Sequence, residues 1–169
     1  MAIQLSLGID YQFEVDPLWC AWFSGLVDGE ASFLIGRGSK NSGGENIFRP
    51  RIHIKLREDD EPLLRSVQSN LRCGNVYHIS YSKERERGSL AQDQVTWVCY
   101  KTQDLIGIVV PILDRFQLKS KKRNDYDLWR RAVQLQSDSA GRYNPTMLLR
   151  LKDEMESNRR GKFSKGCTE

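Results

Sequence analysis

The chain has 169 residues, of which 39% are hydrophobic and 28% charged, a composition typical of one soluble globular domain with a buried core. Its longest apolar stretch, residues 17–27, is about half as long as the roughly 20 residues of a membrane-spanning helix. The N-terminus lacks the basic and then apolar regions of a secretory signal. We therefore expect an intracellular protein of the cytoplasm or an organelle. Four cysteines without CxxC spacing are expected to be buried or incidental thiols, not a zinc site or a disulfide framework: Cys20, Cys73, Cys99 and Cys167.

The formal net charge of +4 is distributed unevenly along the chain. Residues 1–30 contain five acids and no Lys or Arg, a net charge of −5. Residues 31–169 hold all 26 Lys and Arg and the other 17 acids, a net charge of +9. A basic body favours a polyanionic partner, because bound Lys and Arg release the counterions of phosphates. Charge alone leaves open whether that partner is DNA, RNA or an anionic membrane surface.

The predicted elements follow the order α-β-β-α-β-β-α-α-α, an α+β class with antiparallel strands. Periodicity, caps and turn residues place helices at 17–28, 62–71, 103–113, 120–136 and 145–157, and strands at 31–35, 48–57, 74–82 and 94–100. Pro111 is expected to end or kink the third helix. We expect a single domain over 1–169, with an N-terminal arm (1–15), a flexible hairpin loop (36–46), a charged loop (83–93) and a flexible tail (158–169).

The first predicted helix, which Asp16 and Pro17 begin, carries small residues at every fourth position: Ala21, Gly25 and Gly29. Glycine inside a helix costs about 1 kcal/mol relative to alanine, so two on one stripe call for a reason. Close approach of another helix is the usual one. Ordinary core packing, or a glycine at the helix end, is the alternative.

An acidic pair surrounds Gly29 at the end of this helix. Asp28 and Glu30 face the negative end of the helix dipole, which disfavours carboxylates by a few tenths of a kcal/mol. Carboxylate oxygens beside exposed backbone carbonyls suit a hard cation such as Mg²⁺. The alternative is a solvated helix end without a ligand.

Together these features resemble a known motif. Residues 23–31 (FSGLVDGEA) resemble the LAGLIDADG signature of homing endonucleases, with Gly25, Leu26, Asp28 and Gly29 in place. The resemblance extends to residues 51–64, 74–77 and 116–135, so that it covers roughly residues 17–160 in the family's order. It implies the αββαββα homing-endonuclease fold with extra C-terminal helices, in which two antiparallel sheets form a DNA-binding saddle in the dimer.

The resemblance also implies the residues of the active site. Glu30 matches the acid that binds the divalent metal, and the carbonyl of Gly29 matches the backbone ligand. Asp28 matches a position that packs the helix end. The metal implied is Mg²⁺, with Mn²⁺ or Ca²⁺ as substitutes in vitro. The family's supporting lysine matches Lys119, with Lys121 as the next candidate and phosphate binding as the alternative role for both.

The sequence departs from the family at two positions. A glutamine common in the second strand falls on Leu56, so that either Lys55 or Arg57 replaces it or the alignment shifts by one residue. Ala31 stands where the motif ends in glycine, a milder change.

One copy of the motif supplies one metal-binding acid, Glu30, whereas cleavage of both DNA strands needs two such acids. The resemblance therefore implies a homodimer that cuts a near-palindromic site in double-stranded DNA. Its two-fold contact would lie on the motif helix and involve Ala21, Trp22, Gly25 and Gly29.

Strict alternation along residues 48–57 predicts the DNA-reading surface. One face of this strand is apolar, and the other is a basic row suited to guanine edges in the major groove: Arg49, Arg51, His53, Lys55 and Arg57. His53 could instead be a structural surface histidine. Further contacts are expected from Arg37 and Lys40 in the hairpin loop, from Lys121, and less firmly from Tyr77, Thr96 and residues 83–87.

The function that these observations favour is a site-specific, Mg²⁺-dependent homing endonuclease of introns or inteins, which cuts across the minor groove and leaves short 3′ overhangs. The alternative is an RNA-binding maturase that uses the same fold to assist splicing. A non-catalytic DNA-binding relative is a third reading. The acid at position 30 favours the nuclease, because neither alternative needs a metal-binding carboxylate.

Overall fold

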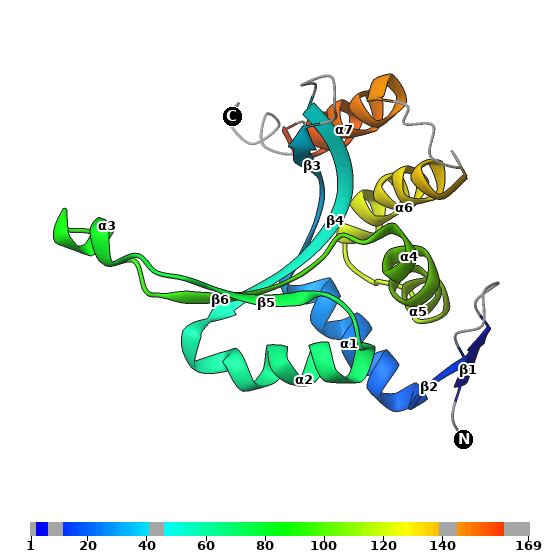
Figure 1. The fold of residues 1–169 in the computed structure, drawn as a ribbon, viewed down its shortest axis with the longest axis horizontal. Helices are drawn as coiled ribbons and strands as arrows, with labels where there is room; N and C mark the ends of the chain where they lie inside the picture. Colours follow the sequence, from blue (N-terminus) through cyan, green and yellow to red (C-terminus); the bar gives the residue numbers. More distant parts are fainter. Residues whose placement is uncertain (1–2, 7–11, 41–45, 139–144, 161–169) are drawn as a thin grey trace, which may run out of the picture.

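The computed structural model describes residues 3–6, 12–40, 46–138 and 145–160 (Figure 1). Its strands are β1 (Ile3–Ser6), β2 (Gln12–Val15), β3 (Ala31–Lys40), β4 (Asn46–Arg57), β5 (Asn75–Ile79) and β6 (Gln94–Cys99). Its longer helices are α1 (Pro17–Glu30), α2 (Glu61–Leu71), α6 (Lys122–Asp138) and α7 (Pro145–Arg160). The shorter ones are the 3₁₀ turn η1 (Glu58–Asp60), α3 (Ser82–Glu86), α4 (Thr102–Asp104), the π-helical η2 (Leu105–Val109) and α5 (Val110–Arg115). The expected α+β class with antiparallel strands is confirmed.

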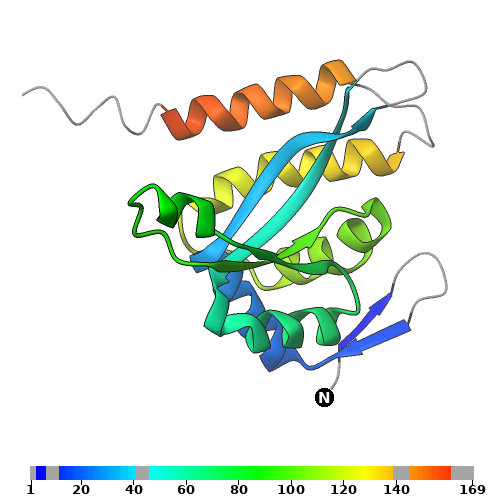
Figure 2. The same ribbon diagram turned by 60° about the vertical axis from the view of Figure 1, so that its left-hand side comes forward.

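The main sheet has the strand order β3-β4-β6-β5, with every neighbouring pair antiparallel. It curves strongly, and α1, α2, α5 and α6 lie on its convex side (Figures 1 and 2). Alternate residues of β3 and β4 are buried in the core on the helix-covered side, as in Phe33 opposite Ile52, and Ile54 stands opposite the buried Trp97 of β6. The largest fully buried side chains of this core are Trp97, Trp129, Tyr126, Phe23 and Phe33. One face of the sheet is thus committed to the core, and the concave face remains for a ligand.

Four local predictions are corrected. The N-terminal arm, expected to be loose, forms the antiparallel hairpin β1–β2, in which Ile3 and Leu5 stand opposite Val15 and Phe13. The strand predicted at 31–35 continues to Lys40, because it pairs with the long β4 across a register shift. The charged loop contains the short helix α3. Pro111 does not end its helix, which continues to Arg115. The other expected outcome, a kink, is consistent with the π-helical turn η2 directly before it, because helices commonly kink at such turns.

The C-terminal helix α7 extends into the predicted tail, as far as Arg160. Near its end, Arg159 donates to the Asp125 carboxylate of α6 at 2.9 Å and to the Phe33 carbonyl of β3 at 2.7 Å. These bonds hold the last turn against the domain, which explains why the helix does not fray at residue 158. Residues 161–169 lie outside the described part. Within that part, no helix is both long and apolar enough to cross a membrane.

Candidate active site and DNA-binding surface

The C-terminal end of α1 carries the predicted metal-binding residues. Asp16 caps the start of this helix by accepting the Leu18 N–H at 3.2 Å. The helix ends at Glu30, and the chain enters β3 at once through Ala31, whose N–H donates to the carbonyl of Val27. This abrupt junction leaves the Glu30 side chain exposed where the motif helix meets the sheet.

Asp28 fastens the end of α1 to the segment that begins α6. Its carboxylate accepts the Lys119 N–H at 2.9 Å, the Ser120 N–H at 3.0 Å and the Ser120 hydroxyl at 2.5 Å. Burial alone raises the pKa of Asp28, but the hydrogen bonds from Ser120 and Lys119 outweigh it and hold the pKa below its usual value of 3.8. This geometry agrees with the packing role that the resemblance implies for Asp28.

We expect Asp28→Asn to destabilise the fold by about 1–3 kcal/mol, because an amide replaces an ionised acceptor of three hydrogen bonds. Since folding lowers the Asp28 pKa, the difference from wild type should be full above pH 3.8 and shrink as the pH falls below that value. Urea unfolding at several pH values measures it. Asp153→Asn on the exposed surface of α7 is the matched control, and equal stability of the two variants would contradict the anchoring role.

A lysine other than the two predicted ones, Lys119 and Lys121, contacts the carbonyls at the end of α1. The Lys122 ammonium donates to the Gly29 carbonyl at 2.9 Å and to the Val27 carbonyl at 3.1 Å. Burial lowers the Lys122 pKa, and the charges of Asp28, Glu30 and Asp125 oppose this effect. The Gly29 carbonyl, which is the predicted backbone ligand of the metal, therefore accepts a hydrogen bond from the positively charged Lys122 side chain in this structure.

The two lysines predicted for the site lie differently. Lys119 offers its backbone N–H to Asp28, while its side chain is exposed, as is that of Lys121. Glu30 has no hydrogen bond or ion pair with any residue that the structure describes, and it influences the nearby Lys122 only electrostatically. Sequence position alone does not show which of Lys119, Lys121 and Lys122 reaches the end of α1, because this depends on the residue at which α6 begins.

The predicted dimer contact lies on the exposed face of α1. The helix buries Cys20, Phe23, Ser24 and Val27 against the core. Its other face exposes the four predicted contact residues together with Leu18: Ala21, Trp22, Gly25 and Gly29. A Cβ at Gly25 or Gly29 would have no neighbouring atom within 4 Å. Core packing within the chain thus does not account for the two glycines.

The predicted basic row lies on the concave face of the sheet. The register of β4 places Arg49, Arg51, His53, Lys55 and Arg57 on the face opposite the core. Thr96 stands opposite both Lys55 and Tyr77, so β5 and β6 add to the same face. Among the described residues, the Thr96 hydroxyl is buried without a hydrogen-bond partner, as are the Nε atoms of Arg49 and Arg51 and Nε2 of His53. This face has donors and acceptors to offer.

The electrostatics of the row keep its histidine neutral. Burial, followed by the charges of Arg51 and Lys55, lowers the pKa of His53 to about 4. A neutral imidazole has one donor and one acceptor, whereas the arginines and the lysine beside it only donate. Arg51 itself lies across the neighbouring strand above Gly36, where a Cβ would collide with its guanidinium.

Three other predicted positions are not found on the concave face with the basic row in the described part of the chain. Arg37 is exposed but stands opposite Phe48, so the register assigns it to the helix-covered side of the sheet and not to the basic row. Lys40 ends β3, and its side chain lies outside the described part. Leu56 packs on the core, which leaves Lys55 and Arg57 as its neighbours on the concave face.

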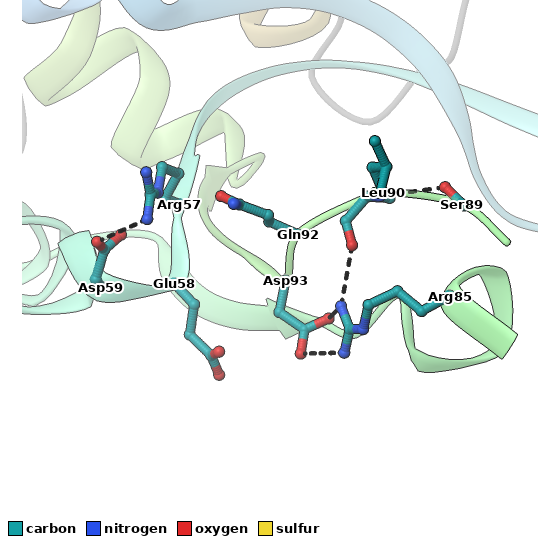
Figure 3. Close-up of a pocket in the computed structure, with 9 residues that line it drawn as sticks. Arg57, Glu58, Asp59, Arg85, Ser89, Leu90, Gln92 and Asp93 are labelled. Atoms are coloured by element: carbon teal, nitrogen blue, oxygen red, sulfur yellow. Dashed lines mark hydrogen bonds and ion pairs between the residues drawn. The ribbon is translucent and has the colours of Figure 1, made fainter.

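The β5–β6 hairpin extends beyond the sheet and carries α3 at its far end (Figure 1). An open pocket there is lined partly by Arg57, Asp59, Arg85 and Asp93 (Figure 3). Arg85 pairs with Asp93 through two bonds of 2.8 and 3.0 Å, and this pairing lowers the Asp93 pKa to about 2. Arg85 is therefore committed to holding the hairpin, while Lys83 and Arg87 are exposed.

The prediction of buried thiols is confirmed for Cys20, Cys73 and Cys99. The fold brings Cys73, Cys99 and Asp104 together although they lie far apart in the chain, and their ligand atoms fall within 4.8 Å of one another. Three such atoms are one fewer than the four of a closed structural zinc site. The two thiols instead contact each other, with 4.0 Å between their sulfur atoms. Cys167 lies outside the described residues.

Comparison with known proteins places this geometry in a family. The model of the LAGLIDADG endonuclease family matches residues 23–133. That segment contains the end of α1, the whole main sheet and the start of α6, which together form the candidate site. A comparison with curated proteins gave no match.

Solved meganucleases share the fold at low sequence identity. The meganuclease I-CpaMI bound to uncleaved DNA is 23% identical over 78% of this chain, with a TM-score of 0.60. I-SmaMI, bound to an uncleaved DNA target with calcium ions, is 18% identical over 90% of the chain (TM-score 0.66), and I-LtrWI bound to target DNA is 15% identical over 90% (TM-score 0.63). This chain spans 41%, 48% and 46% of those three chains, less than half of each. By its motif helix, its sheet and the match to the family model, the chain belongs to the LAGLIDADG endonuclease family.

Proposed function

We propose that the chain is a site-specific endonuclease that cleaves both strands of DNA and serves the homing of an intron or intein. The observation that carries this proposal is the end of α1, where the exposed Glu30 follows Gly29, whose carbonyl accepts a hydrogen bond from the Lys122 ammonium. The related structures I-CpaMI, I-SmaMI and I-LtrWI, each bound to DNA, support the choice of substrate.

The donors at this end of α1 suit a hard divalent cation. Glu30 offers carboxylate oxygens and Gly29 a carbonyl, and the bond from the Lys122 ammonium to that carbonyl is consistent with a site that attracts positive charge. We assign Glu30 and Gly29 as the residues that would hold Mg²⁺. When bound, such an ion lowers the pKa of water and stabilises the charge of the reacting phosphate. The I-SmaMI structure with uncleaved DNA was obtained in the presence of calcium ions, which is consistent with a requirement for a divalent ion.

The protein's own residues would supply position and charge. Asp28 fixes the end of α1 through its bonds to Lys119 and Ser120, and so holds the Glu30 carboxylate at a defined place. Lys119, whose backbone is fixed by the same contact, would support the charge of the transition state from its exposed side chain. Lys121 would bind a phosphate.

We further propose that two copies assemble through the exposed face of α1. Gly25 and Gly29 leave room for a second helix backbone, and Trp22 and Leu18 would lose exposed apolar surface. Such a dimer would bring two Glu30 residues to its centre and recognise a near-palindromic site, because a two-fold axis relates its halves.

The concave face of the sheet would bind the DNA. Its basic row would contact guanine edges and phosphates, and neutral His53 and Thr96 would add uncharged hydrogen bonds. Cleavage across the minor groove with short 3′ overhangs is what the resemblance to the LAGLIDADG family implies for this chain.

Cleavage of a randomised double-stranded DNA library, with Mg²⁺ and with EDTA, tests the proposal. We expect a single family of near-palindromic sequences to be cut only with Mg²⁺, leaving 3′ overhangs at the cut ends. The protein with EDTA is the control for metal dependence. Cutting that EDTA does not stop, or a preference for RNA with no DNA cut at all, would contradict the assignment.

A further inference from the structure

The position of the Lys122 ammonium has a consequence for metal binding, and this consequence rests on the proposed function. Its two bonds, of 2.9 Å to the Gly29 carbonyl and 3.1 Å to the Val27 carbonyl, place a positive charge at the backbone ligand that we assign to the metal. Asp28, Glu30 and Asp125 all act on this ammonium electrostatically. The carbonyl of Gly29 thus has a bound cation before any metal enters.

We propose that Lys122 is a latch that competes with the divalent ion for the Gly29 carbonyl and is released when the ion binds. Two cations at one carbonyl repel each other strongly, so the ion must displace the ammonium or bind without this ligand. Release then leaves a free ammonium close to Glu30, in a place to bind a phosphate of the DNA. Lys122 therefore lowers the affinity of the free protein for metal and adds positive charge to the loaded site.

The local structure allows this release at low cost. The Val27 carbonyl loses the bond from Lys122 but keeps the bond from the Ala31 N–H, while the Gly29 carbonyl would exchange the ammonium for the ion. The backbone of Lys122 stays in place because its N–H donates to the Ser120 hydroxyl at 3.1 Å, and that hydroxyl donates to Asp28. Only the flexible side chain of Lys122 has to move.

The latch predicts that Lys122→Met has opposite effects on two measurements. Mn²⁺ binding to the full-length protein without DNA, measured by the loss of the free-ion EPR signal, should become at least about fivefold tighter, because a competing charge is removed. Cleavage of the target should fall at the same time. A residue that only supports the fold would weaken both. Lys121→Met removes the same charge from an exposed neighbour and should leave Mn²⁺ affinity within about twofold of wild type.

A second measurement uses the wild-type protein and does not depend on the folding of a variant. The reactivity of individual lysine amines toward an acylating reagent is measured by mass spectrometry, with and without saturating Mn²⁺. We expect Lys122 to be protected without the ion and to become more reactive with it, while Lys121 stays unchanged. In Glu30→Gln the reactivity of Lys122 should not respond to Mn²⁺.

The outcomes separate the latch from the proposed function. If Mn²⁺ binds Lys122→Met no more tightly than Lys121→Met, and wild-type Lys122 stays protected with the ion, the latch is overturned although cleavage by the wild type stands. If both metal responses occur but no DNA is cut, the latch stands and the endonuclease assignment is wrong. Mn²⁺ binding that Glu30→Gln does not weaken overturns the metal site itself and the latch with it.

Discussion

Glu30→Gln is expected to abolish cleavage, by at least about a thousandfold, and to leave DNA binding close to wild type. The neutral amide keeps the size of the side chain but removes the negative charge that a divalent ion requires. Because Glu30 is exposed and has no hydrogen bond with any described residue, its replacement should not disturb the fold. Cleavage and electrophoretic mobility shift on the selected target measure the two effects.

The matched control is Glu154→Gln, which removes the same charge from an exposed position on α7. It should cut DNA like the wild type. Loss of one negative charge from the proposed DNA-binding site also reduces repulsion of phosphate, so binding by Glu30→Gln should be equal to or slightly tighter than that of the wild type. Normal cutting by Glu30→Gln would remove this carboxylate from the mechanism, and loss of binding would make its role structural.

The parts of the fold that could be predicted were those governed by local signals. Asp16 and Pro17 mark the start of α1 by chemistry that does not depend on the rest of the chain. The alternation of β4 likewise separates its apolar from its basic side, since one face of the strand must be buried. The same signal was present in the N-terminal hairpin, where Ile3 and Leu5 pair with Val15 and Phe13, but short segments carry it weakly.

The parts that could not be predicted depend on contacts between distant segments. Three lysines fall within four residues, and only the starting point of α6 decides that Lys122 turns back to α1 while Lys119 and Lys121 do not. Arg37 belongs to the opposite side of the sheet from the basic row because of a register that its loop composition does not reveal. The pairing of Arg85 with Asp93 inside the charged hairpin is equally invisible in the sequence.

The charge asymmetry of the chain also gains a physical explanation from these contacts. The acidic N-terminal segment ends in the helix that presents Glu30, and the described lysines and arginines lie outside that helix, in part on the concave face of the sheet. The ammonium of Lys122, at the start of α6, contacts the acidic end of this helix through the Gly29 carbonyl. For the proposed metal site this separation is favourable, because basic residues other than Lys122 then lie outside the helix that carries Glu30 and compete less with the ion.

Gly25→Leu is expected to separate the proposed dimer while leaving the fold of each copy intact. A Cβ at Gly25 has free space within 4 Å in the single chain, and leucine has a higher helix propensity than glycine, so the monomer should be as stable as the wild type or slightly more stable. In the dimer the new side chain would push two closely approaching helices apart. Overpacking costs about 1–3 kcal/mol per site and occurs twice across a two-fold axis, which weakens association by about 2–6 kcal/mol, or roughly thirtyfold to twenty-thousandfold.

Sedimentation velocity over a range of concentrations measures the association, and thermal unfolding measures the stability of the chain. Ser69→Leu, which adds the same side chain to an exposed position of α2, should remain a dimer and distinguishes a specific contact from a general effect of surface leucine. Loss of double-strand cleavage together with the dimer would follow, because each copy brings one Glu30 to the site. A wild-type protein that sediments as a monomer, alone and on DNA, would refute the two-fold assembly, and with it the requirement for open space at Gly25.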